Sequence, residues 1–299
     1  LPDCSNMCHE SSGKGLGQTI GIGKGTVHLE DFDLADVIIV MGQNPGTNHP
    51  RMLTALRDAK KKGATIIHIN PLPEAGLERF KHPQDYMKLN FSSTQLSDYH
   101  LQVRIGGDAA LLKGLIKVHD EIGSLDHEFI DSSTIGLDSM LQKARSIPWQ
   151  DIETDSGILE QQIRQVGAVL AKSNGTIACW AMGLTQQPNG VAVIQEVVNL
   201  LLMGGHVGRP GAGFCPVRGH SNVQGDRTVG IWEAPPKSFL KKMEEGLKTP
   251  MPKEHGYDVV NAIRAMRRGD VDVFFCMGGN FISATPDTVA TAEEFKKLV

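Results

Sequence analysis

Two short apolar runs separated by an amphipathic segment most constrain how this chain can fold. Residues 35–41 and 64–69 each have the length and apolar composition of a buried strand, and each leads into a polar loop. Residues 51–62 between them have the spacing of an amphipathic helix, which Gly63 ends. A strand–helix–strand unit joins parallel strands through a right-handed crossover. The sequence therefore predicts an α/β fold with a parallel, Rossmann-like sheet, in which ligands bind beyond the carboxyl ends of the strands.

Further patterns extend this fold along the chain. Residues 176–181 and 271–277 are apolar runs that predict two more buried strands, and residues 87–91 predict a short edge strand. The glycine-rich residues 13–25 follow no strand and lack the full spacing of a phosphate-binding loop, so we expect a closely packed or flexible loop there. Further helices are expected over residues 109–120, 126–131, 137–146, 158–172, 191–203 and 257–268.

Length and composition narrow the class of protein. A chain of 299 residues is long enough for two domains, and we expect one complete α/β lobe over residues 1–217 and part of a second over 218–299. The net charge of -4 is too small to indicate a partner such as nucleic acid or a membrane surface, and no apolar run reaches the length of a membrane span. Five scattered cysteines form no disulfide framework, which favours a reducing, cytoplasmic location.

The most reactive stretch lies at the start of the chain, over residues 3–13. Cys4, Cys8 and His9 stand within six residues, and a cysteine thiolate is the form that binds metal or attacks an electrophile. The spacing does not fit a structural zinc site, which needs four ligands. From these residues alone, two ordinary thiols in a turn before the first helix remain an equal alternative.

A second unusual stretch is the long glycine-rich connection over residues 204–230. Its glycines let the backbone approach a ligand closely, and polar side chains among them can donate hydrogen bonds. Arg218 can hold a carboxylate through two parallel hydrogen bonds, although a structural salt bridge is the alternative role. The polar side chains of this stretch are Arg218, His220, Asn222, Gln224 and Arg227.

Polar loops with a similar sequence follow several predicted strands. Gly42-Gln43-Asn44-Pro45 follows the first predicted strand, and Gly278-Gly279-Asn280 follows the last one. The repeated Gly-x-Asn arrangement suggests two related α/β lobes that face one ligand.

Together these stretches resemble the molybdopterin oxidoreductase superfamily, and within it the formate-dehydrogenase-like alpha subunits. Cys8 matches the cysteine or selenocysteine that ligates molybdenum, and His9 matches the histidine that follows it. Residues 216–225 resemble the loop that carries the substrate-facing arginine, here Arg218. The resemblance implies contacts to the cofactor from Gly42, Asn44, Pro45, Asn70, Met182, Gly183, Gln186, His220, Asn222, Gln224, Gly278 and Asn280.

This resemblance implies a concrete function. The cofactor would be molybdenum bis(molybdopterin guanine dinucleotide), and the reaction the two-electron oxidation of formate or a similar small anion. Cys8 would ligate the metal, Arg218 would orient the anion, and His9 would accept the released proton. Electrons would leave through a 4Fe-4S cluster outside this chain to an electron-acceptor protein or subunit. We expect the chain to be the central piece of a longer protein and to be inactive alone.

Two alternatives stand beside this interpretation. One is a cofactor-free structural or electron-transfer relative, similar to the large iron–sulfur subunit of respiratory complex I. The other is an unrelated nucleotide-binding α/β domain. The sequence also departs from the family pattern, with Asn6 in place of a frequent arginine, Asn70 in place of an aspartate and His220 in place of a glutamine.

Overall fold

The computed structural model describes residues 8–84, 93–220, 222–285 and 287–298. Cys4, Asn6 and the expected strand over residues 87–91 lie outside these ranges. The described chain divides into two compact units, one spanning Cys8–Gly219 and the other holding the described residues from His220 onward. The expected boundary between domains at residues 217 and 218 stays a prediction. In the described ranges, no helix combines the length and apolar character needed to cross a membrane.

The first unit is built on a five-stranded parallel sheet, which confirms the predicted α/β class. The strands lie in the order β5-β2-β1-β6-β7, so two strands lie on one side of β1 and two on the other. The predicted strands at 35–41, 64–69 and 176–181 are all present, whereas β5 and β7 were not predicted. The strands are β1 Val37–Met41, β2 Thr65–Ile69, β5 Tyr99–Leu101, β6 Thr176–Trp180 and β7 Gly213–Pro216.

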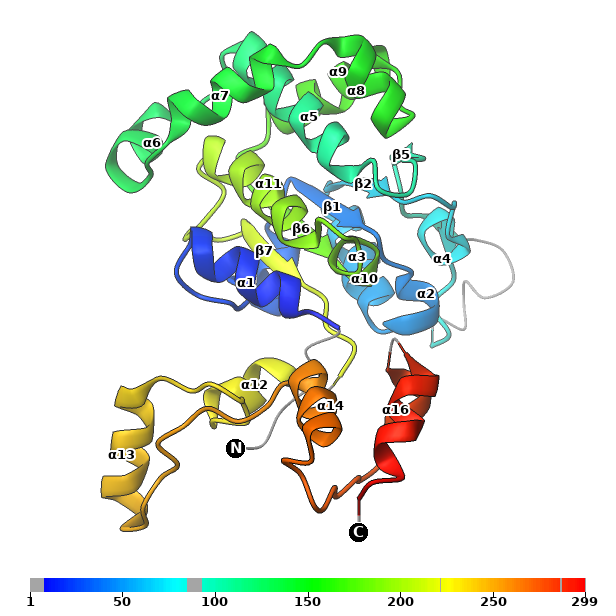
Figure 1. The fold of residues 1–299 in the computed structure, drawn as a ribbon. Helices are drawn as coiled ribbons and strands as arrows, with labels where there is room; N and C mark the ends of the chain where they lie inside the picture. The colour runs from blue at the N-terminus through cyan, green and yellow to red at the C-terminus, as the bar shows by residue number, and fades with distance from the viewer. Residues whose placement is uncertain (1–7, 85–92, 221, 286, 299) are drawn as a thin grey trace. The chain divides into compact units, whose positions relative to one another are not determined.

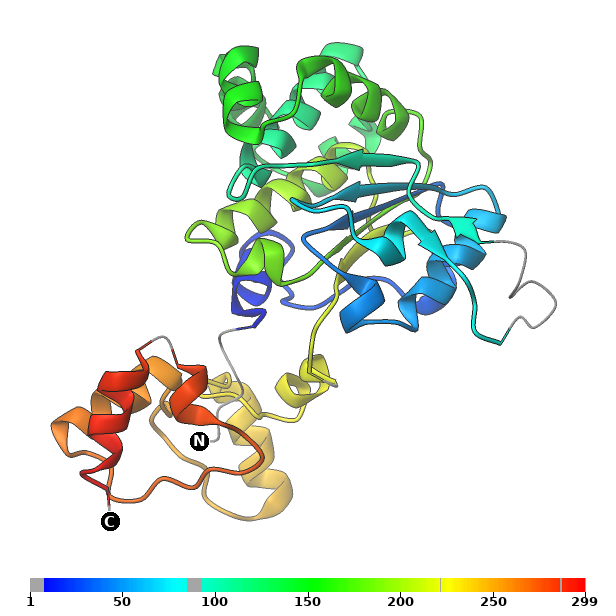
Figure 2. The same cartoon turned by 90° about the vertical axis from the view of Figure 1, so that its right-hand side faces the viewer.

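Helices cover both faces of this sheet, because alternate residues of each strand point to opposite sides. Ile39 and Met41 of β1 pack into the core formed with α5, α9 and α11, while Ile38 and Val40 pack into the core formed with α3. Figures 1 and 2 show these helices on opposite sides of the sheet. The bounds are α3 Met52–Lys61, α5 Asp108–Ile122, α9 Glu160–Leu170 and α11 Gly190–Met203.

The remaining elements of this unit are short. The helix α8 was not predicted, whereas the predicted helices over 126–131 and 137–146 correspond to α6 and α7. The helices are α2 Pro45–Asn48, α4 Ala75–Glu78, α6 His127–Ser133, α7 Leu137–Ser146, α8 Trp149–Ser156 and α10 Met182–Thr185, with a 3-10 turn at Leu29–Asp33. The strands β3 Arg79–Phe80 and β4 Thr94–Gln95 form a separate antiparallel pair.

The expectation of a loop over residues 13–25 was wrong for its first half, which lies in helix α1, Glu10–Thr19. Glycine costs about 0.5–1 kcal/mol in a helix relative to alanine, so the sequence argued against a helix here. Packing outweighs this cost: Leu16 is fully buried, and α1 lies against α11. A β-carbon on Gly15 would stand 2.8 Å from Cγ2 of Ile194, so the glycine permits the two helices to approach.

The described part of the second unit consists of helices and irregular segments. The buried strand expected over residues 271–277 is not formed: Val273, Phe275 and Met277 are 72%, 84% and 84% exposed. An apolar run becomes a strand only beside another strand, and the described residues of this unit provide none. The helices are α12 Val223–Thr228, α13 Lys237–Leu247, α14 Val259–Arg268, α15 Phe281–Ala284 and α16 Thr288–Phe295.

Candidate functional site

The carboxyl ends of β1 and β6 meet at the point where the strand order reverses, which is where open α/β sheets bind ligands. Gly42 follows β1 with a φ of 54°, and its carbonyl accepts a hydrogen bond of 3.0 Å from the Gly183 amide after β6. A β-carbon on Gly183 would stand 2.5 Å from the Cα of Gly42. Both positions therefore require glycine, and they present bare backbone beside the exposed side chain of Met182.

Two predicted asparagines are held by one carboxylate that the sequence did not reveal. Asn44 caps α2 by accepting from the Thr47 amide, and its Nδ2 donates to Oε2 of Glu74 at 2.6 Å. Asn70, buried at the end of β2, donates through Nδ2 to Oε1 of Glu74 at 3.0 Å. Glu74 thus links the loops after β1 and β2. Pro45, also predicted, is the buried first residue of α2.

Cys8 lies just before α1, on the same edge of the sheet. Its carbonyl accepts a hydrogen bond of 2.7 Å from Oγ1 of Thr185, and Ser11 donates to the Thr185 carbonyl at 2.9 Å. These bonds hold the start of α1 against α10, which follows β6. The Cys8 thiol is partly exposed.

His9 is buried and has a partner for each ring nitrogen. Nε2 lies 3.1 Å from the Val217 carbonyl, which can only accept, so Nε2 carries the proton. Nδ1 lies 2.9 Å from Oγ of Ser12, and that oxygen accepts from the indole nitrogen of Trp180 at 2.8 Å. The Ser12 hydroxyl therefore donates to Nδ1. We call the chain Trp180–Ser12–His9–Val217 the His9 relay.

The expected role of His9 as a proton acceptor stays a prediction, and the surroundings of its ring bear on it. Burial, followed by the nearby charge of Arg218, lowers the pKa of His9 from 6.5 to about 4. The imidazole is therefore neutral at pH 7, with both nitrogens occupied. That arrangement suits a residue that positions the backbone, and it does not favour the expected proton acceptor.

His49, which was not predicted, repeats the arrangement one residue further along. Its Nε2 donates to the Arg218 carbonyl at 3.1 Å, and its Nδ1 accepts from Nε2 of Gln43 at 3.3 Å. Gln43 is 3% exposed, and its Oε1 has no hydrogen-bond partner among the described residues. A buried acceptor without a partner needs a donor from water or a ligand. The signal in the sequence was the position of Gln43 and His49 in the loop after a predicted strand.

Arg218 follows β7, and the bonds from His9 and His49 fix its backbone on both sides of the residue. One terminal amino group of its guanidinium donates to the Gly23 carbonyl at 2.9 Å. The next residue, Gly219, lies beside the metal-ligand candidate: a β-carbon there would stand 3.8 Å from Sγ of Cys8. The structure thus brings Cys8, His9 and the 218–219 segment together from opposite ends of the first unit.

The other predicted residues are placed as follows. Gln186 is exposed at the end of α10. His220, Asn222, Gln224, Gly278 and Asn280 belong to the second unit. Within it, His220 is exposed, Asn222 precedes α12 with a φ of 54°, and Gln224 lies in α12.

The predicted Gly-x-Asn repeat recurs in local backbone geometry. Gly42 and Gly278 have φ values of 54° and 67°. Asn44 and Asn280 each precede a four-residue helix, with φ and ψ of -112° and 84° for the first and -104° and 71° for the second. Only the first of the two loops follows a strand, because residues 271–277 form none.

The parallel sheet has glycines at its switch point. A thiol, two imidazoles and an arginine lie at its carboxyl edge, an arrangement typical of a cofactor-binding α/β protein. The model of the molybdopterin oxidoreductase family matches residues 4–299, and the chain belongs to this family. The family implies a molybdenum–pterin cofactor. The resemblance stated from the sequence is confirmed at this level.

Relatives of this chain include proteins from several bacteria. An uncharacterized oxidoreductase of Mycobacterium tuberculosis H37Rv is 50% identical over 303 residues, which cover 99% of this chain and 39% of that protein. Protein YdeP of Escherichia coli K12 is 48% identical over 309 residues, covering 100% of this chain and 41% of YdeP. Formate dehydrogenase H of Escherichia coli K12 is 26% identical over 304 residues, covering 99% and 40%. The chain therefore spans well under half the length of these relatives.

A solved structure agrees on the fold. Acetylene hydratase from Pelobacter acetylenicus matches with a TM-score of 0.71 over 97% of this chain and 40% of that one, at 17% identity.

Proposed function

We propose that this chain forms the central region of a molybdenum bis(molybdopterin guanine dinucleotide) oxidoreductase that oxidises formate or a similar small anion. The observation that carries the proposal is the convergence of Cys8 with the Arg218–Gly219 segment at the switch point of the sheet. A thiol and a guanidinium at one such edge suit a metal ligand beside an anion-binding group. The similarity to formate dehydrogenase H supports formate as the first substrate to test.

The residues present fit a pterin dinucleotide. Gly42 and Gly183 leave bare backbone where a β-carbon would clash, and Gln43 offers a buried acceptor that lacks a partner. Asn44 and Asn70, held through Glu74, present amides at the ends of the first two strands. These residues would hold the cofactor, and Cys8 would supply its protein ligand to the metal. When bound, the cofactor supplies the two-electron redox chemistry.

Arg218, His9 and His49 then each have a proposed role. Arg218 would bind the anionic substrate and orient it beside Cys8. His9 and His49 hold the carbonyls of Val217 and Arg218, which restrains the backbone that carries the guanidinium. Because burial lowers the pKa of His9 to about 4, His9 would be a weak acceptor for the substrate proton, and we propose it as a positioning residue instead.

One observation favours the cofactor-free alternative. The Arg218 guanidinium bonds to the Gly23 carbonyl, a contact that a structural scaffold would also use. The two proposals differ in what Cys8 does. A scaffold does not need its thiol, whereas a molybdenum enzyme loses its protein ligand when the thiol is removed.

The test uses the full-length protein, purified without oxygen, with molybdenum and tungsten content measured beside formate oxidation by a dye acceptor. We expect metal in the wild type, and loss of activity in Cys8→Ala. Cys276→Ala removes an exposed thiol of the second unit and serves as the matched control. An active wild-type preparation without either metal, or a Cys8→Ala variant with full activity, would sink the proposal. Metal with no formate oxidation would retain the cofactor assignment and reject the substrate.

A further inference from the structure

Two cysteines outside the proposed cofactor site face each other on neighbouring strands. Cys179 of β6 is in direct register with Cys215 of β7 in the parallel sheet. Paired residues of adjacent strands point to the same face; Cys179 belongs to the core packed with α3, and the partly buried Cys215 packs against that core. The sheet thus holds two thiols side by side.

The spacing of the sheet suits a bond between them. Neighbouring strands lie about 4.8 Å apart. Disulfide-linked residues have Cα atoms about 4.4–6.8 Å apart, so the backbone requires little movement.

The two thiols differ in reactivity. Burial, with the hydrogen bond to Cys215, raises the pKa of the fully buried Cys179 thiol well above its usual value. The same hydrogen bond from Cys179 lowers the pKa of the Cys215 thiol. Cys215 is partly exposed and lies on an edge strand, so a small oxidant can reach it. An accessible thiol with the lower pKa beside a second thiol is the arrangement of a redox-responsive pair.

We propose that Cys179 and Cys215 are a redox-active pair that a peroxide converts reversibly into a disulfide joining β6 to β7. The inference goes beyond the proposed function and does not depend on it. It concerns a modification site on the strand whose end leads into Arg218.

Peroxide would form the disulfide in two steps. The Cys215 thiolate attacks one oxygen of hydrogen peroxide, the O–O bond breaks, and the hydroxide that leaves takes up a proton, which gives a sulfenic acid and water. The sulfur of Cys179 then attacks the Cys215 sulfur; an S–S bond forms, the S–O bond breaks, and a second water leaves with the thiol proton. Overall the two thiols lose two electrons and the peroxide gains them. A dithiol reductant reverses the bond by thiol–disulfide exchange.

The test treats the native full-length protein with hydrogen peroxide, blocks the remaining thiols under denaturing conditions, and maps the peptides by mass spectrometry. We expect a linked pair of peptides containing Cys179 and Cys215, lighter than the sum of the two reduced peptides by two hydrogen atoms. Dithiothreitol should restore both free thiols. Cys276→Ala, which removes an exposed thiol, should leave the linked pair unchanged.

Two variants separate the steps. Cys215→Ser, close in size, should abolish the linked peptide, and Cys179→Ala should leave Cys215 as a sulfenic acid that dimedone labels. If either variant fails to fold by circular dichroism, the wild-type peptide map decides by itself. The proposal is overturned if Cys179 and Cys215 stay separately alkylated after peroxide treatment. Linkage of either cysteine mainly to Cys8 or Cys276 overturns it as well.

Discussion

His9 and His49, from two different loops, donate hydrogen bonds to the carbonyls of two successive residues. His9 holds Val217 at 3.1 Å, and His49 holds Arg218 at 3.1 Å. In each case a neighbouring side chain donates to the other ring nitrogen, so both imidazoles carry the proton on Nε2. The backbone at Arg218 is therefore held by the residue just before α1 and by the residue just after α2.

Ser12→Ala should destabilise the first unit. The substitution leaves the indole N–H of Trp180 and Nδ1 of His9 without their shared partner, in a region where both groups are buried. Each buried group left without a hydrogen bond costs about 1–3 kcal/mol. Urea unfolding measures the loss. Ser146→Ala, which removes an exposed hydroxyl, is the control and should stay within about 0.5 kcal/mol of the wild type. Equal stability of the two variants would show that the His9 relay contributes nothing.

Gly183→Ala should disrupt the switch point, because the added methyl would stand 2.5 Å from the Cα of Gly42. Backbone must move to relieve such a contact, so we expect a lower unfolding temperature and loss of bound cofactor from the full-length protein. Gly17→Ala in α1 is the matched control, since a β-carbon there meets nothing within 4 Å. Its helix propensity should raise stability by about 0.5–1 kcal/mol. Retention of wild-type stability and cofactor by Gly183→Ala would contradict the close approach.

Arg218→Lys tests the proposed anion clamp. Lysine keeps the charge but loses the two parallel donors of a guanidinium. Hydrogen bonds to charged groups contribute about 1.5–3 kcal/mol, so kcat/KM for formate should fall about 10- to 100-fold. The molybdenum content should stay unchanged, because Arg218 is not proposed to ligate the metal. An unchanged kcat/KM would assign Arg218 a purely structural role through Gly23.

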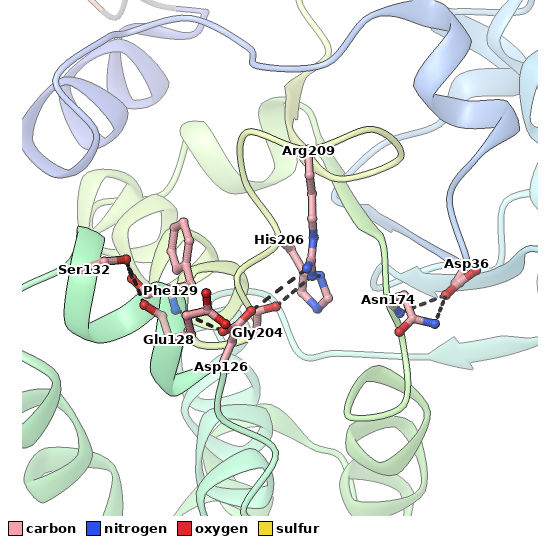
Figure 3. A network of polar contacts seen from close by, with 9 residues as sticks. All are labelled: Asp36, Asp126, Glu128, Phe129, Ser132, Asn174, Gly204, His206 and Arg209. Atoms are coloured by element: carbon pink, nitrogen blue, oxygen red, sulfur yellow. Dashed lines mark hydrogen bonds and ion pairs between the residues drawn. The ribbon is translucent and has the colours of Figure 1, made fainter.

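The buried His206, near the amino ends of the strands, should make the first unit less stable in acid. Arg209 donates to Nδ1 of His206 and to the Gly204 carbonyl (Figure 3). Its Nη1 lies 4.0 Å from Oδ2 of Asp126. Burial, followed by the charges of Arg209 and His119, lowers the pKa of His206 from 6.5 to about 4, against smaller opposing effects of Asp126 and Asp36.

The direction of the pH dependence of stability follows from proton binding to His206. Between pH 6.5 and 4 the unfolded chain binds a proton at His206 and the folded chain does not, so stability falls as the pH is lowered through this range. The slope for one such group is at most about 1.36 kcal/mol per pH unit. His206→Gln should reduce the slope of the unfolding free energy between pH 6.5 and 4. Ser146→Ala, which changes no titratable group, should retain the wild-type slope. Equal slopes in the wild type and His206→Gln would refute the prediction.

The apolar runs of the sequence were enough to predict the centre of the sheet, and its motifs were enough to identify the family. The apolar runs that became β1, β2 and β6 are buried on both faces, and such runs have few alternatives to a central parallel strand. The edge strands were not predicted because they lack such apolar runs. Tyr99–Leu101 is short and partly polar, and Gly213–Pro216 is short and bounded by a glycine and a proline, so only pairing with β2 and β6 makes them strands. The run over 271–277 shows the converse, since apolar residues without a neighbouring strand stay irregular.

Residue types at the start of the chain and in the glycine-rich connection were enough to select Cys8, His9 and Arg218 as candidates. Their contacts and protonation states depend on the folded arrangement. In the sequence, a histidine next to a cysteine suggests a proton acceptor. In the fold, His9 is buried beside Ser12 and Trp180, which favours a neutral ring with hydrogen bonds at both nitrogens. His49 and the Cys179–Cys215 pair likewise depend on strand order and register. Local sequence specifies which groups are present, whereas their protonation and partners depend on what the fold packs around them.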